Sequence, residues 1–294
     1  MSGASGIVMV PGAQPPLPGL LNSKPAQPPK LALAQLNGHL NGAGLGSGRA
    51  LEVDDLALPA GQRFNLLQEP LRSQLLAKLG VEASAKVEAA QGVQGGLNLG
   101  VWFVRSHSED LVLKLVRHDS KAPPALIEAE CLQRLHREHP DIVRDSTVAF
   151  PHKILRILDR GMRRHDLIVM ARAPGQILAV KISELWHSGR QNELMAVLEE
   201  VGACLGTFHR RYRKNHGDMA VQNVFYNDKR GRVTLIDIGG MGCRTDSTDV
   251  ERFTLSLRQL GAFYGQWLSS EGVQRFQKGH ARTSDTAWPG RGGA

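Results

Sequence analysis

The sequence predicts an α+β fold of two lobes, in which a small lobe of five strands and one helix precedes a short, mainly helical lobe. Two observations support this class. Short apolar runs rich in β-branched residues are concentrated between about residues 81 and 175. Segments with helical periodicity lie mainly after residue 190, beyond a short connection near Met170.

The two ends of the chain lack helical or strand periodicity. Residues 1–60 are rich in Pro, Gly and Ala, and we expect a disordered tail there. Within it, GAGLGSG resembles a phosphate loop, but no predicted strand precedes it, so we interpret it as linker. Residues 276–294 are expected to form a loose C-terminal tail. A single domain is therefore predicted over residues 61–275.

The first lobe is predicted over about residues 81–170. A helix, EPLRSQLLAKLG, precedes it, with Pro70 in the first turn and Gly80 at the end. Turn signals separate five expected strands: VEASAKVEAAQG, LNLGVWFVR, EDLVLKLVR, KILRILDRG and DLIVMARAPG. The helix of this lobe, PALIEAECLQRLHREH, lies between the third and fourth strands.

The second lobe, about residues 175–270, is predicted to be mainly helical. NELMAVLEEVGACLGTFHRRY and DVERFTLSLRQLGAFYGQWL each carry an apolar stripe at helical spacing. Between them, the polar segment HGDMAVQN (residues 216–223) is followed by a short buried strand in RVTLIDIGG. This polar segment is either an ordinary loop or a catalytic one.

Charge and composition narrow the classes of partner. The net charge is +8, but aromatic residues are only 5% of the chain, so a solvated basic surface is favoured over a nucleic-acid site. The basic cluster HRRYRK is interpreted as cations that complement a helix C-terminus rather than as a binding site for RNA or an acidic substrate.

Cysteine usage and hydropathy bear on the compartment. Cys131, Cys204 and Cys243 stand far apart without a CxxC pair, which indicates free thiols in the cytoplasm or another reducing intracellular compartment. No apolar run reaches the roughly 18 residues that a membrane span needs. The acid-free N-terminal tail leaves organelle targeting open.

Several polar features of the first lobe match the requirements of phosphoryl transfer, which needs positioning and charge neutralisation. Gly92, Gly95 and Gly96 lie between two predicted strands, where a flexible turn allows backbone amides to approach phosphate oxygens. Lys114 lies within an apolar strand and could reach the phosphates. An inward-pointing lysine in such a strand needs a charge partner.

The geometry of the next helix indicates which acid could pair with Lys114. The inward stripe of the next helix consists of Leu126, Ala129, Leu132 and Leu135. At about 100° per residue, Glu128 lies about 40° from the centre of this stripe and Glu130 lies about 160° away. We therefore expect Glu128 to pair with Lys114 and Glu130 to face solvent.

The second lobe supplies oxygen ligands and a candidate base. Asp218 could accept a hydrogen bond from an attacking hydroxyl and orient it. Asn223 and Asp237 could bind a divalent cation through an amide and a carboxylate oxygen, and hard ligands of this kind suit Mg²⁺. Gly239 and Gly240 would permit a sharp turn after Asp237.

The glycine turn, Lys114, Glu128, HGDxxxxN and IDxGG, in this order, resemble the protein-kinase-like superfamily over about residues 85–268. The resemblance implies a five-stranded antiparallel N-lobe, ATP and Mg²⁺ as cofactors, and a hinge near Met170 that contributes to the nucleotide site. It implies that Asp218 is the base, that Lys114 contacts phosphate, and that His216 and Asp249 hold the loop in a structural role.

The departures from this pattern bear on function. HGD stands where ordinary protein kinases have HRD, and it is usual in aminoglycoside and choline kinase-like enzymes and in minimal atypical kinases. Asp237 and Asp249 are so close in sequence that a phosphorylated activation loop has almost no room, so activity would be constitutive or controlled by a partner. We expect a serine/threonine protein kinase because the second lobe is short. A small-molecule kinase and a nucleotide-binding pseudokinase scaffold are the alternatives.

Each candidate residue also has an ordinary interpretation. Lys114 by itself would be an edge-strand lysine, and Glu128 a surface acid of a helix. Asn223 could be a turn residue, and Asp237 could form an Asx turn before two glycines. Their joint occurrence in the right order and on the right element types favours the phosphotransferase interpretation.

Overall fold

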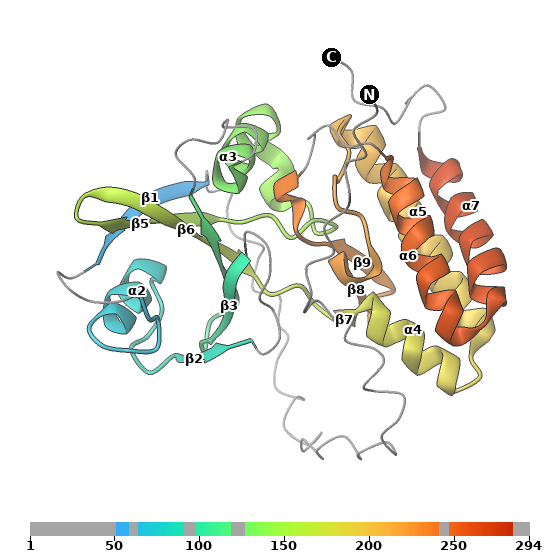
Figure 1. Cartoon of the computed structure of the whole chain (residues 1–294), viewed down its shortest axis with the longest axis horizontal. Coiled ribbons are helices and arrows are strands. Elements are labelled where there is room, and N and C mark those ends of the chain that lie inside the picture. Colours follow the sequence, from blue (N-terminus) through green and yellow to red (C-terminus); the bar gives the residue numbers. More distant parts are fainter. Residues whose placement is uncertain (1–50, 59–63, 91–97, 119–126, 241–246, 285–294) are drawn as a thin grey trace, which may run out of the picture. The chain divides into compact units, whose positions relative to one another are not determined.

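The computed structural model describes residues 51–58, 64–90, 98–118, 127–240 and 247–284. These residues form an α+β fold, with a six-stranded sheet in the first half and a group of helices in the second (Figure 1). The Gly92, Gly95 and Gly96 turn and the segment GAGLGSG lie outside the described residues. Cys131 is buried and Cys204 half-buried, while Cys243 lies outside the described residues.

The six-stranded sheet contains every strand expected for the first lobe. Its strands are β1 (Glu52–Ala57), β2 (Lys86–Ala89), β3 (Asn98–Arg105), β4 (Asp110–Arg117), β5 (Lys153–Asp159) and β6 (Met162–Ala171). They are ordered β1-β5-β6-β4-β3-β2, and all neighbours are antiparallel except β1, which runs parallel to β5. β2 is shorter than the segment VEASAKVEAAQG from which it was predicted.

The expectation of five antiparallel strands was wrong in one respect. β1 adds a sixth strand, and it comes from residues that we expected to belong to a disordered tail. Its sequence EVDDLA is acidic and only Leu56 is buried, so no local pattern indicates a strand. Pairing with β5 satisfies its backbone groups, and Lys153 and Lys78 provide cations for Glu52 and Asp54.

Two helices cover the sheet on opposite faces. α2 (Leu71–Leu79) packs on the face to which Leu113 and Leu115 point. α3 (Glu128–Glu138) lies on the other face, because side chains alternate along a strand and Lys114 contacts it. α2 confirms the helix predicted from EPLRSQLLAKLG, but it packs on the sheet as a second helix of the small lobe, for which the sequence predicted one helix. The apolar stripe of α3 is confirmed at Ala129, Leu132 and Leu135.

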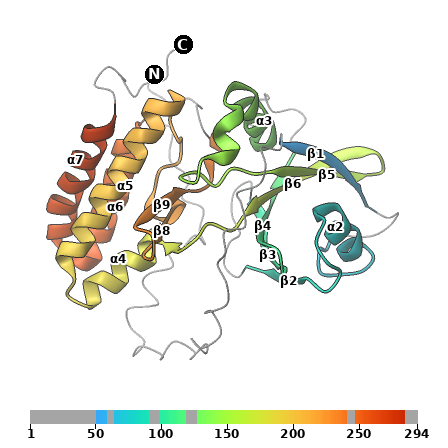
Figure 2. The ribbon, with the colours of Figure 1, turned by 180° about the vertical axis from the view of Figure 1, so that it is seen from behind.

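The second half of the chain is mainly helical (Figure 2). Its helices are α4 (Leu178–His187), α5 (Gln191–Tyr212), α6 (Asp249–Tyr264), the π-helix Leu268–Gly272 and α7 (Val273–Thr283). A small antiparallel sheet consists of β7 (Gln176–Ile177), β8 (Val224–Asn227) and β9 (Arg232–Leu235); Asn223 lies directly before β8, and Asp237 follows β9. α4 and β7 were not predicted from the sequence.

α7 differs from the loose tail that we expected from residue 276, because the helix continues to Thr283. It packs on α5 with the two backbones in direct contact. A Cβ on Gly202 would lie 1.9 Å from the carbonyl oxygen of Phe276, and a Cβ on Gly279 would lie 1.9 Å from that of Glu199. Glycine at these positions therefore permits a helix pair that local sequence pattern does not indicate.

The basic cluster at the end of α5 forms ion pairs with acids at the end of α3 and directly after it. Arg211 forms ion pairs with Asp141 and Asp145, and Lys214 Nζ lies 3.0 Å from Glu138 Oε2. These contacts provide the cations with protein partners in addition to the helix dipole. None of the helices within the described ranges combines the length and apolar character that crossing a bilayer requires.

Candidate functional site

Lys114 contacts two acids that are distant in the sequence. Its Nζ lies 2.9 Å from Glu128 Oε1 on α3 and 2.5 Å from Asp237 Oδ1, which follows β9. The side chain of Lys114 is 14% exposed, that of Glu128 18% and that of Asp237 36%. The contact expected between Lys114 and Glu128 is present, and Asp237 joins it from the other half of the chain.

The electrostatics of this group favour a further cation. Burial by itself would lower the pKa of Lys114, but Glu128 and Asp237 outweigh burial and raise it, so the lysine stays protonated. Burial raises the pKa of Glu128, and the negative charge of Asp237 adds to this rise, although Lys114 opposes it. One ammonium facing two carboxylates leaves surplus negative charge, which a divalent cation would neutralise.

Glu130 does not face solvent as we expected. Arg163 on β6 donates to Glu130 Oε1 at 2.9 Å and to both oxygens of Asp166, which is fully buried. The bridge connects α3 to β6 of the sheet. The helical angle placed Glu130 away from the apolar stripe correctly, but it could not show that a strand arginine reaches it.

The backbone at Asp237 has an unusual conformation, and the turn that follows lies close to Glu128. Asp237 adopts a φ of 61°, a left-handed conformation that non-glycine residues rarely take and that is often found at functional sites. Gly239, two residues later, lies against Glu128: a Cβ on this glycine would be 2.3 Å from Glu128 Cγ. The turn after β9 therefore has room for the Glu128 side chain only because residue 239 is glycine.

The segment HGDMAVQN folds so that its two functional candidates touch. Asn223 Nδ2 donates to the carbonyl oxygen of Asp218 at 2.8 Å and to Asp218 Oδ2 at 3.0 Å. These bonds use the amide nitrogen of Asn223 and leave its amide oxygen as the group that a cation would meet. The side chain of Asp218 is 58% exposed, whereas Asn223 is buried.

His216 connects this loop to the strand that carries Asp237. The backbone N–H of Asp218 donates to His216 Nδ1 at 3.3 Å, so the proton lies on Nε2, which donates to the carbonyl of Ile236 at 2.9 Å. Burial lowers the pKa of His216, which keeps the ring neutral and this arrangement intact. The role of His216 is structural.

Asp249, the first residue of α6, anchors the loop HGDMAVQN through hydrogen bonds. Its carboxylate accepts the N–H of His216 at 2.5 Å and of Gly217 at 2.9 Å, and it contacts His209 Nε2 at 2.8 Å. Burial alone would raise the pKa of Asp249, but the hydrogen bond from His209 and the neighbouring donors lower it. The loop is therefore attached to the helical core through a buried, ionised carboxylate.

Met170 lies on β6, opposite Val112 on β4. Alternation along the two strands puts it on the same face as Lys114, which pairs with Ile168. It is half-buried and immediately precedes the connection to the helical lobe. Its contribution to a nucleotide site stays a prediction.

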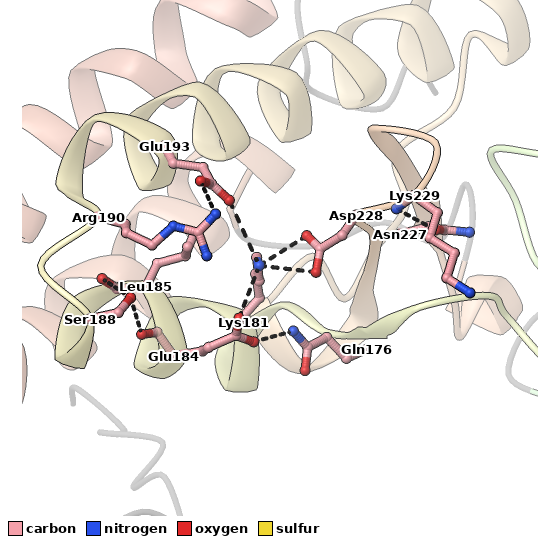
Figure 3. Close-up of polar contacts among 10 residues, drawn as sticks. All are labelled: Gln176, Lys181, Glu184, Leu185, Ser188, Arg190, Glu193, Asn227, Asp228 and Lys229. Atoms are coloured by element: carbon pink, nitrogen blue, oxygen red, sulfur yellow. Dashed lines mark hydrogen bonds and ion pairs between the residues drawn. The ribbon is translucent and has the colours of Figure 1, made fainter. Parts of the chain in front are cut away.

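Sequence reasoning missed a charged cluster in the helical lobe (Figure 3). Lys181 on α4 is buried, and its Nζ lies 2.9 Å from Asp228 Oδ1, 3.3 Å from Glu184 Oε1 and 3.9 Å from Glu193 Oε1. The cluster joins α4, α5 and the β8–β9 turn. A lysine at an apolar-stripe position, between Leu178 and Leu185, is the signal that could have revealed it.

The donor set can be compared with the needs of a metal ion. Within the described parts of the chain, no three His, Cys, Asp or Glu side chains come close enough to hold a metal ion. Asn223 and Asp237 would contribute only two oxygens.

No protein-family model matches the chain, and no curated protein matches it either. Among solved structures, it is similar to the kinase domain of maize sucrose-induced receptor kinase 1 bound to AMP-PNP, with 13% identity and a TM-score of 0.35. The match covers 53% of this chain and 51% of that domain, so the chain spans about half of its length. A similarity of this size does not assign the fold family.

Proposed function

We propose that this protein is an ATP- and Mg²⁺-dependent phosphotransferase of the protein-kinase-like type, with a hydroxyl group as acceptor. The observation that carries the proposal is the convergence of Lys114, Glu128 and Asp237. They come from β4, α3 and the turn after β9, and one ammonium contacts both carboxylates. Positioning and charge neutralisation of this kind are what phosphoryl transfer asks of a protein.

Each residue has a distinct role in the proposal. Lys114, oriented by Glu128, binds the α- and β-phosphates of the nucleotide. Asn223 and Asp237 hold Mg²⁺, which supplies positive charge against the phosphate oxygens. Asp218 accepts a hydrogen bond from the acceptor hydroxyl, orients it and takes its proton.

A serine or threonine of a protein is the acceptor that we favour. The side chain of Asp218 is 58% exposed and is therefore accessible to a segment of another chain. Gly217 and Asp249 support the loop from the side of the core, so Asp218 is free to present its carboxylate outward. Two outcomes would replace the assignment of a protein acceptor: transfer to a small alcohol, or nucleotide binding without transfer.

The proposal is tested by incubating the full chain with radiolabelled ATP and Mg²⁺ and following transfer to itself, to protein mixtures and to a panel of small alcohols. Asp218→Asn is expected to lower transfer by about 10²–10⁴-fold, since it removes a positioned base. Asp141→Asn, at an exposed acid outside the site, is the control. Equal transfer by wild type and Asp218→Asn would contradict the proposal.

Gly239→Ala is expected to lower kcat by about 10- to 100-fold, because misplacement of a positioning group by about 1 Å has effects of this size. The new methyl group would occupy the space of Glu128 Cγ and push that side chain away from Lys114. The Glu128 side chain is flexible, so we expect the fold to be retained. Steady-state kinetics beside a thermal unfolding curve measure both. Gly231→Ala, where a Cβ meets nothing within 4 Å but a φ of 57° makes the substitution strained, controls for a loss of stability without contact with Glu128.

A further inference from the structure

Arg252 stands beside the candidate base and was not noticed in the sequence. It lies in the first turn of α6, and its Nη1 is 3.9 Å from Asp218 Oδ1. This separation permits an electrostatic contact but exceeds hydrogen-bond length. The side chain of Arg252 is 36% exposed, and that of Asp218 is 58% exposed, so both groups reach solvent at the same place.

The guanidinium of Arg252 has donors to spare. Its Nε is buried and has no hydrogen-bond partner among the described residues. A buried donor left without an acceptor costs about 1–3 kcal/mol, and native structures rarely tolerate it without a reason. Because Nε is buried, an anion from solvent would be bound through the exposed part of the guanidinium, whose fork of N–H groups matches a carboxylate or phosphate.

The neighbouring acids of α6 do not compete for Arg252. Asp249 is occupied by His209 and by the backbone of His216 and Gly217. Glu251 forms a capping box with Thr248 at the start of the helix. The only acid with which an ion pair of Arg252 is present in the described structure is Asp218, and that pair is long.

An anionic acceptor needs a cation at this position. The loop HGDMAVQN contains no Lys or Arg, and its one histidine, His216, is buried and kept neutral, so its exposed functional group is the carboxylate of Asp218. A negatively charged substrate would be repelled there unless a nearby cation offset the charge. Arg252 is that cation, and it comes from a different element, so its presence does not depend on the loop motif.

We propose that Arg252 binds an anionic group next to the reacting hydroxyl, so that the acceptor is a serine or threonine with an aspartate or glutamate beside it. Consecutive Cα atoms lie about 3.8 Å apart, so an acid one or two positions away can reach Arg252 while the hydroxyl lies at Asp218. The inference rests on the proposed function. In that reaction the bond from the hydroxyl oxygen to the γ-phosphorus forms, the bond from that phosphorus to ADP breaks, and the hydroxyl proton passes to Asp218.

The test uses degenerate peptide libraries with one serine, in which each flanking position is fixed as Asp, Asn or Lys. For the wild-type full chain, kcat/KM is expected to be about tenfold higher with Asp than with Asn at one flanking position, which corresponds to about 1.4 kcal/mol. Arg252→Gln should abolish this preference, so that kcat/KM for the Asp library falls to that for the Asn library. Arg252→Glu should reverse the preference toward Lys.

Arg258→Gln is the matched control, because Arg258 is an exposed arginine on the same helix and should leave the preference intact. A nucleotide-dependent thermal shift equal to that of the wild type shows that each variant is folded and binds ATP. If Arg252→Gln lowers transfer to all libraries equally, Arg252 only positions Asp218 and the inference is overturned.

The failures of the two proposals are distinguishable. Suppose that transfer to some acceptor depends on Asp218, but that the Asp and Asn libraries are phosphorylated equally or no peptide is phosphorylated. This result overturns the role of Arg252 and leaves the proposed phosphotransferase activity in place. Absence of any Asp218-dependent transfer from ATP overturns both.

Discussion

Lys114→Met is expected to lower the rate of phosphoryl transfer by about 10²–10³-fold, the usual effect of removing one preorganised electrostatic group from an active site. The methionine fills the same space on β4 but cannot contact phosphate. It also leaves Glu128 and Asp237 facing each other without the ammonium that now lies between them. Single-turnover kinetics with saturating Mg²⁺ and ATP measure the loss at the chemical step.

Lys153→Met provides a control matched in element and charge. Lys153 also lies on a strand of the same sheet and is 13% exposed, and it pairs with Glu52. Its loss removes a strand lysine from its carboxylate partner without touching the site. Comparable losses of activity in the two variants would mean that Lys114 acts through sheet stability alone.

Asp249→Ala is expected to destabilise the fold by about 3–5 kcal/mol, because each buried donor that loses its acceptor costs about 1–3 kcal/mol. Asp249 is fully buried, and its loss would leave the N–H groups of His216 and Gly217 and the ring of His209 without their acceptor. The loop that carries Asp218 would lose its attachment to α6. Urea unfolding of the two proteins at neutral pH measures the difference in the free energy of unfolding.

The pH dependence of this difference follows from the pKa of Asp249, which is lowered in the folded state. A lowered folded pKa means that the carboxylate stabilises the fold above the pKa of the unfolded chain, about 3.9, and that this contribution disappears as the pH falls through the folded value. The difference in the free energy of unfolding between wild type and Asp249→Ala should therefore be constant at neutral pH and become smaller below about pH 4.

Asp141→Ala, which removes an exposed ion pair with Arg211, should lower the free energy of unfolding by no more than about 1 kcal/mol. An equal cost for the two variants would contradict the anchoring role.

The candidate site was predictable where one residue could be related to its neighbours by local geometry. The contact between Lys114 and Glu128 followed from strand alternation and from the angle of Glu128 on its helix. The roles of these residues, and those of Asp218, Asn223 and Asp237, stay predictions until the assays are done. Arg252 and Glu130 show the limit of such reasoning. Each acquires its significance from a residue on another element, Asp218 or Arg163, and no spacing along the chain relates them.

The elements divide in the same way. The sequence by itself determined the helices α3, α5 and α6 and the strands β3 to β6, because hydrophobic periodicity is a local property of the chain. Only the tertiary structure decided that EVDDLA forms a parallel edge strand, since its partner β5 lies about a hundred residues away. It also decided that α7 is a helix: Gly279 lowers helix propensity, yet that glycine and Gly202 allow α7 to meet α5 backbone to backbone. Contacts between distant segments supply free energy that local pattern does not contain, and at these positions that contribution outweighs intrinsic propensity.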